Sequence, residues 1–183
     1  MSRALSPNFF QSFLIYTRAL TNVRMPPLSG RAIIVTGGRR GIGAAIVSAC
    51  LDAGARVVSG DVLPPSPASP PPAGLVEVVA DVSCAAGHAS LVQACLAAFG
   101  RLDGLVNNAG INFCKPFLST TEAEYDRLMA VDLRGLFFLT QAAVRHAVAS
   151  SAPLSIVNIA SVHALQGVAG AGPYDAAKAG VVA

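Results

Sequence analysis

The chain has 183 residues, of which 53% are hydrophobic and 13% charged, and this composition predicts one domain around a sizeable core. Residues 1–30 contain three arginines and no acidic residue, whereas the rest is neutral, so the net charge of +3 does not predict a nucleic-acid-binding face. The 6% of aromatic residues and the absence of tryptophan also argue against a stacking surface for nucleic acid. No apolar run reaches the ~18 residues needed to span a bilayer, so we expect neither a nucleic acid nor a membrane as partner.

The four cysteines do not form a pattern that binds metal. They are Cys50, Cys84, Cys95 and Cys114. None forms a CxxC pair, and histidines do not cluster with them, so we expect no metal site and reduced thiols, as in a cytoplasmic protein.

Residues 1–28 are expected to be an N-terminal extension outside the domain. Residues 1–24 contain arginine, serine and threonine without any acid, a composition typical of an organelle transit peptide, which would place the protein in mitochondria. Two alternatives stay open: the segment is an extension without a targeting role, or translation begins at Met25.

Strands and helices alternate along the remaining chain. Apolar, β-branched runs predict five buried strands, at 31–38, 55–61, 75–82, 102–110 and 154–161. Helices are expected at 41–54, after Ser83 as N-cap to about residue 99, at 120–150 with a capping box of Thr121 and Glu124, and from 171 onward. The proline-rich stretch 64–74 can only be a loop. This alternation predicts an α/β fold with a doubly wound parallel sheet of the Rossmann type.

The turn after the first strand has the composition of a phosphate-binding loop. Gly37, Gly41, Ile42 and Gly43 lie between a buried strand and a helix. Glycines at this spacing allow a tight turn, and they let backbone N–H groups and a helix N-terminus face a pyrophosphate.

Two features of the sequence disagree about the dinucleotide. Asp61 ends the second strand, where a carboxylate accepts hydrogen bonds from ribose hydroxyls and repels the 2′-phosphate of NADP. Arg39 and Arg40 lie in the loop and could hold that phosphate. We favour Asp61, because its charge lies at the hydroxyl that distinguishes the two cofactors, and expect NAD(H) over NADP(H).

With these motifs, residues 29–183 resemble the short-chain dehydrogenase/reductase family. The motifs are "TGGRRGIG" at 36–43, "DV" at 81–82, "NNAG" at 107–110, Ser161, and Tyr174-x-x-x-Lys178. The stretches "GRLDGLVNNAGI" and "SIVNIASVHA" are most similar to 3-oxoacyl-carrier-protein reductases and related alcohol dehydrogenases. The resemblance implies a small carbonyl or alcohol substrate and a homodimer or homotetramer.

The resemblance also implies roles for residues. Asp81 and Val82 would flank the adenine, and Asn107, Ala109 and Gly110 would line the cofactor cleft. Tyr174 would be the acid/base, with Lys178 as its electrostatic partner, and Ser161 would hold the substrate oxygen; Tyr174 and Lys178 would also contact the cofactor.

Elementary chemistry supports the same assignments. Hydride transfer to a ketone develops negative charge on oxygen, so a proton donor must lie beside it. A lysine four residues after a tyrosine shares its helix face, and the positive charge favours tyrosinate. Ser161 follows the fifth strand, at the carboxyl edge where sites of open α/β sheets form.

Asp132 departs from the family pattern. It stands in "VDLRG", where the family has an asparagine that orders a water in the proton relay to the lysine. The Asp132 charge could pair with Lys178 and withdraw the lysine from its role, or it could tighten the proton relay. We expect Asp132→Asn to preserve or raise turnover. We expect His88 and His146 on helix surfaces, while His163 either touches substrate or is an ordinary loop residue.

The sequence contains five expected strands, whereas family members continue with a sixth strand, a substrate lid and a final strand. We therefore expect a sheet without its C-terminal strands and an exposed fifth strand. Three functions stay open: an oxidoreductase, a non-catalytic dinucleotide-binding remnant, or an interaction protein.

Overall fold

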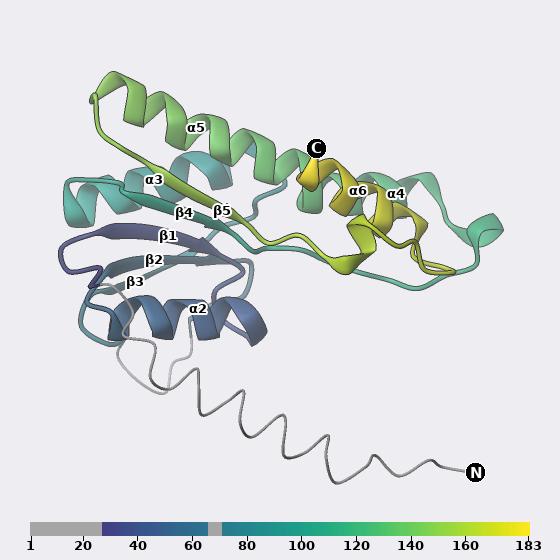
Figure 1. Cartoon of the computed structure of the whole chain (residues 1–183), viewed down its shortest axis with the longest axis horizontal. Helices are drawn as coiled ribbons and strands as arrows, with labels where there is room; N and C mark the ends of the chain where they lie inside the picture. Colours follow the sequence, from purple (N-terminus) through teal and green to yellow (C-terminus); the bar gives the residue numbers. More distant parts are fainter. Residues whose placement is uncertain (1–26, 66–70) are drawn as a thin grey trace, which may run out of the picture.

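The computed structural model describes residues 27–65 and 71–183. Within that range the chain forms one parallel sheet flanked by helices (Figure 1). The predicted transit segment and the middle of the proline-rich loop lie outside the described residues. Among the helices that the structure describes, none has the length and apolar character needed to cross a membrane.

The five predicted strands are present. They are β1 (Ala32–Thr36), β2 (Arg56–Asp61), β3 (Leu75–Val79), β4 (Gly104–Asn107) and β5 (Ser155–Asn158). Their order in the sheet is β3-β2-β1-β4-β5, and every neighbouring pair is parallel. The sheet reverses its direction of growth at β1, which confirms the doubly wound arrangement.

Helices cover both faces of the sheet. The main helices are α2 (Gly41–Asp52), α3 (Ala85–Phe99), α4 (Glu122–Met129), α5 (Leu136–Ala149) and α6 (Gly172–Val182). In Figure 1, α2 lies on one face and α3 with α5 on the other, while α4 and α6 lie beyond one end of the strands. The chain reaches α4 and α6 from the carboxyl ends of β4 and β5, so this is the carboxyl end of the sheet.

The core follows the period of two of the strands. On β1, Ala32 and Ile34 pack toward α3 and α5, whereas Ile33 and Val35 pack toward α2. Because successive side chains of a strand point to opposite faces, a continuous apolar run fills both cores. Burying one such side chain contributes about 1.5–3 kcal/mol. Because β1 supplies buried side chains to both cores, both helix layers depend on it.

The fifth strand lies at the edge of the sheet, as the sequence predicts. All four of its residues are exposed, with Ile156 at 37% and Val157 at 52% of their maximal area. Its only partner in the sheet of the described residues is β4.

Two expectations at the start of α3 are wrong. The N-cap residue is Cys84 and not Ser83, whose backbone N–H instead donates to Asp81 Oδ1 at 2.8 Å. His88 is buried and not on the surface, with Nε2 2.6 Å from the carbonyl oxygen of Val82. The helix packs tightly against the turn after β3, and Gly87 allows this approach, since a Cβ there would lie 2.0 Å from the Asp81 carbonyl.

The long helix predicted at 120–150 is interrupted. A π-helical segment, η2 (Ala130–Gly135), separates α4 from α5. Such segments are rare in proteins overall, but where they occur they often lie at functional sites.

The predicted capping box at the start of α4 is confirmed, because Thr121 and Glu124 hydrogen-bond each other's backbone N–H. The Lys115 ammonium, 2.8 Å from both carboxylate oxygens, and the Thr121 N–H lower the pKa of Glu124 to about 2.

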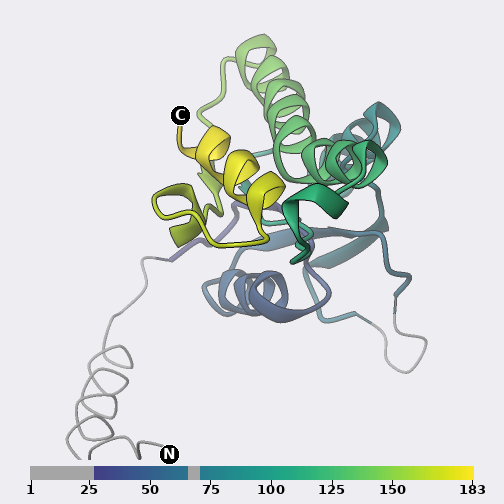
Figure 2. The ribbon, with the colours of Figure 1, turned by 90° about the vertical axis from the view of Figure 1, so that its right-hand side faces the viewer.

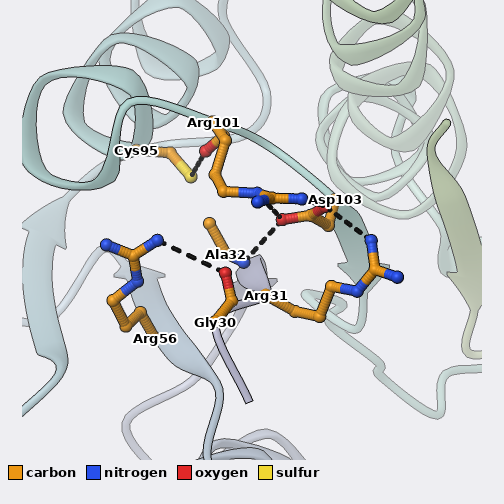
Figure 3. Close-up of polar contacts among 7 residues, drawn as sticks. All are labelled: Gly30, Arg31, Ala32, Arg56, Cys95, Arg101 and Asp103. Carbon is orange, nitrogen blue, oxygen red and sulfur yellow. Dashed lines mark hydrogen bonds and ion pairs between the residues drawn. The ribbon is translucent and has the colours of Figure 1, made fainter. Parts of the chain in front are cut away.

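At the opposite, amino end of the sheet, Asp103 joins β1 to β4 (Figure 3). One carboxylate oxygen accepts the Ala32 N–H at 2.8 Å and Arg101 Nε at 2.7 Å. The other accepts Arg101 Nη2 at 2.6 Å and Arg31 Nη1 at 3.0 Å. Burial alone would raise the pKa of Asp103, but these hydrogen bonds outweigh it and lower the pKa to about 2.

This network predicts an acid-dependent loss of stability. Because the folded-state pKa of Asp103 lies below that of the unfolded chain, the contribution of its carboxylate is complete above about pH 4 and is lost as the pH falls toward about 2. Asp103→Asn is expected to lower the free energy of unfolding at pH 7 by about 1 kcal/mol, since solvent screens the half-exposed arginines. Urea unfolding between pH 2 and 7 measures this. The exposed Asp52→Asn is the control, and an unchanged acid dependence in Asp103→Asn would contradict the prediction.

Candidate functional site

The turn between β1 and α2 has the backbone that a phosphate-binding loop requires. Gly37 adopts φ +64°, a left-handed conformation that side-chain-bearing residues rarely adopt, and its N–H donates to the Gly60 carbonyl at 2.7 Å. A Cβ at Gly43 would lie 2.0 Å from the carbonyl oxygen of Gly37. Glycine at position 43 therefore lets the first turn of α2 close over the loop, with its N–H groups open to an anion.

A hydrogen-bond network joins this loop to the end of β4. Thr36 Oγ1 accepts the backbone N–H groups of Asn108 and Ala109, each at 3.0 Å. The Asn108 side chain donates to the carbonyls of Thr36 at 2.9 Å and Gly37 at 3.2 Å. The two strand ends that frame the site are thus fixed relative to each other.

Between these strand ends lies a cleft of about 580 Å³ at the carboxyl edge of the sheet. Most residues predicted to bind a cofactor line it: Gly37, Arg40, Gly41, Ile42, Gly43, Asp61, Asp81, Val82, Ala109 and Gly110. The cleft also contains residues that the sequence did not single out: Gly60, Val62, Ala80, Ser83, Asn108, Ile111, Arg127 and Val131. Asn108 was within reach of sequence reasoning, because it belongs to the same "NNAG" motif.

The Asp61 carboxylate is buried at the end of β2 and lines the cleft. Its oxygens accept the backbone N–H groups of Arg39 and Leu63, each at 3.1 Å. Each carboxylate oxygen keeps acceptor capacity beyond these bonds. Asp81 is held in a similar way, and the hydrogen bond from the Ser83 backbone lowers its pKa.

Four of the predicted cofactor residues do not line the cleft: Arg39, Asn107, Tyr174 and Lys178. The Arg39 side chain is buried beside a separate hollow of about 420 Å³, with Nε 3.7 Å from Glu77 Oε1. Asn107 is buried between β4, β5 and α5, where its amide nitrogen donates to Thr140 Oγ1 and Asn158 Oδ1, both at 2.9 Å.

Ser161 follows the carboxyl end of β5, and Tyr174 and Lys178 lie on α6, which Figure 2 shows with α4 in front of the sheet. Ser161 is the N-cap of a short 3₁₀ helix, η3 (Val162–Ala164), which packs against α6. Tyr174 and Lys178 lie on successive turns of α6, with Lys178 Nζ 5.5 Å from the centre of the tyrosine ring. Lys178 Nζ donates to the Ile159 carbonyl at 3.1 Å, which ties α6 to the end of β5.

Asp132 and Lys178 form a buried ion pair. Asp132 lies in the π-helical segment and is 1% exposed, and its Oδ2 is 3.5 Å from Lys178 Nζ. Its Oδ1 accepts the Ile111 N–H at 2.7 Å, while Oδ2 has no hydrogen-bond partner among the described residues. Burial raises the pKa of Asp132, and the Ile111 N–H and the Lys178 charge only partly oppose this.

Gly110 makes room for this carboxylate. A Cβ there would lie 2.8 Å from Asp132 Oδ2. The geometry confirms that Asp132 pairs with Lys178, and Asp132 contacts the cleft-lining residues Gly110 and Ile111.

No group of three or more histidine, cysteine or acidic side chains suited to hold a metal ion occurs within residues 27–65 and 71–183. The glycine loop and the cleft fit a dinucleotide: Gly37 and Gly41 adopt positive φ, Gly43 leaves no space for a Cβ, and the cleft opens beside them.

Comparison with known proteins agrees with this geometry. The family model described as short chain dehydrogenase matches residues 31–183. This chain belongs to the short-chain dehydrogenase family.

Three similar proteins illustrate the match. The 2-dehydro-3-deoxy-D-gluconate 5-dehydrogenase of Dickeya dadantii is 30% identical over 85% of this chain and 63% of its own length. The NADP-dependent (R)-specific alcohol dehydrogenase of Lentilactobacillus kefiri is 35% identical over 84% of this chain and 63% of its own length. The crystal structure of levodione reductase superposes with a TM-score of 0.75 at 33% identity, covering 84% of this chain and 63% of that one. The chain thus spans somewhat less than two thirds of the relatives that it matches.

Proposed function

We propose that this protein is an NAD(P)-dependent oxidoreductase that interconverts a secondary alcohol and a ketone. The observation that supports the proposal is that Lys178 of α6 bonds the Ile159 carbonyl after β5 and pairs with Asp132, whose carboxylate lies against Gly110 of the glycine-lined cleft. Members of this family are NAD(P)-dependent dehydrogenases and reductases.

In the proposed mechanism the cleft holds the dinucleotide, with its pyrophosphate at Gly37, Gly41 and Gly43. The bound dinucleotide supplies or accepts the hydride. Tyr174 gives a proton to the carbonyl oxygen during reduction and removes it during oxidation, and the Ser161 hydroxyl donates a hydrogen bond to the same oxygen. The positive charge of Lys178 stabilises the tyrosinate that forms.

The substrate is proposed to be a small carbonyl compound, with 3-oxoacyl thioesters as the first class to test. The relatives support a small substrate, since their names specify a sugar acid, an alcohol and levodione. A panel of acetoacetyl thioesters, cyclic diketones and keto sugar acids, each with NADH and NADPH, separates these classes.

Removal of the Tyr174 hydroxyl tests the proposed chemistry. Tyr174→Phe is expected to lower kcat by about 10²–10⁴-fold, the usual contribution of general acid/base catalysis. NADH affinity, measured by fluorescence titration, should change by less than about threefold, because the glycine-lined cleft is untouched. Tyr125→Phe, an exposed position on α4, is the matched control. Cofactor binding without turnover in the wild-type chain would instead favour the non-catalytic alternative.

We also propose that NAD(H) is preferred over NADP(H). Asp61 presents a buried negative charge at the end of β2, on the cleft, where a 2′-phosphate would have to lie. Arg39, which could neutralise that phosphate, is directed to Glu77 instead. Arg40 is exposed at the cleft and is the one arginine of the loop in reach of a phosphate there.

Asp61→Asn tests this preference. The amide oxygen still accepts one N–H while the charge is removed, so the ratio of Kd values for NADPH and NADH should shift toward NADPH on the order of tenfold. Isothermal titration with both cofactors measures the ratio, with Asp52→Asn as the control. An unchanged ratio would show that Asp61 does not set the preference.

Asp132→Asn tests whether the buried carboxylate restrains Lys178. Asparagine can still accept the Ile111 N–H, but it no longer balances the lysine charge, so more of that charge acts on Tyr174. Turnover at pH 7 is therefore expected to be preserved or raised, and the basic limb of the pH–rate profile should move to lower pH. A large loss of activity at unchanged melting temperature would refute this role.

A further inference from the structure

A second polar pair lies beside the proposed catalytic residues. His163 Nδ1 is 2.6 Å from Asp175 Oδ1, and both side chains are largely buried, at 22% and 17% exposure. His163 belongs to η3, just after Ser161, and Asp175 follows Tyr174 in the first turn of α6. The pair thus connects the two segments that carry the serine and the tyrosine.

Each member also contacts one of these segments directly. The His163 backbone N–H donates to Ser161 Oγ at 3.2 Å, and its ring meets the Tyr174 ring edge-to-face, with centroids 5.2 Å apart. The second oxygen of Asp175 accepts the Val168 N–H at 2.8 Å. Both oxygens of Asp175 are therefore used to hold the chain between Ser161 and α6.

Apolar burial does little to hold that chain in place. The large apolar side chains of the segment are exposed: Val162 at 77%, Leu165 at 87% and Val168 at 47%. With so little apolar surface removed from water, its position depends on polar contacts.

The charge state of Asp175 fixes the orientation of the histidine. The Val168 N–H, and next the His163 side chain, lower the pKa of Asp175, so the carboxylate is ionised at neutral pH. An ionised carboxylate only accepts hydrogen bonds, so Nδ1 of His163 carries the proton. The ring is thereby held against Tyr174 in one orientation.

We propose that His163 and Asp175 are a positioning pair that sets the distance between Ser161 and Tyr174. The pair fastens the loop after β5 to the first turn of α6, so that serine and tyrosine meet the same substrate oxygen. The effect on catalysis rests on the proposed oxidoreductase function, whereas the fastening itself does not.

The fastening is tested by NMR on the full chain without substrate. In the wild type, the Nδ1 proton of His163 should be observable, and the Val168 amide should be protected from exchange. Asp175→Ala should abolish the Nδ1 signal and speed exchange at Val168 by about tenfold or more, while the controls His146→Ala and Asp52→Ala change neither. An unprotected Val168 amide in the wild type, or unchanged exchange in Asp175→Ala, would overturn the proposal.

The catalytic consequence is tested by a double-mutant cycle. His163→Ala and Asp175→Ala should each lower kcat by about tenfold or more with little change in the KM for the cofactor, because misplaced groups slow chemistry more than binding. The double variant should lose no more than the single ones, as expected of a coupled pair. His163→Asn, whose amide nitrogen can donate near the position of Nδ1, should regain most of the activity.

The two tests separate the two proposals. If the wild type reduces none of the carbonyl panel, the proposed function fails, and the NMR result alone decides on the pair. If the wild type is active, losses that add up in the double variant, or no rescue by asparagine, would overturn the positioning role.

Discussion

The parallel pairing of β1 with β4 is the constraint on which the site depends. In a parallel sheet all strands end at the same edge, so the glycine loop after β1 and the polar turn after β4 must meet. Hydrogen bonds between Thr36 and Asn108, which involve both side chains, then hold the glycine loop against the polar turn. Neither residue acts on a substrate in the proposed mechanism, yet the shape of the cleft follows from them.

Most of the fold could be predicted from the sequence, because its signals are local. The apolar strands owe their burial to their own composition, and β1 fills both cores through its alternation alone. The capping box of Thr121 and Glu124 is likewise a matter of residues three apart. The need for glycine at positions 37 and 43 also arises from backbone geometry within a single turn.

The misses have a different physical origin, because long-range packing decides them. His88 has helix-surface spacing, but its helix packs against the turn after β3 and the ring binds a carbonyl there. Asn107 is one residue from the cleft, yet the strand alternation turns it inward to Thr140 and Asn158. Arg39 turns to Glu77 on β3, a partner 38 positions away that no local pattern reveals.

Tyr174 lies between two polar pairs, Lys178 with Asp132 and His163 with Asp175. Lys178 lies 5.5 Å from its ring and favours tyrosinate, but this lysine is shared with Asp132. On the other side, the His163 ring contacts Tyr174 and is held by Asp175. Burial makes the Asp132 charge costly, whereas hydrogen bonds from the Val168 N–H and the His163 side chain make the Asp175 charge favourable. In the proposed mechanism the first pair tunes the charge on the tyrosine, and the second, whose carboxylate pKa is lowered, holds its position.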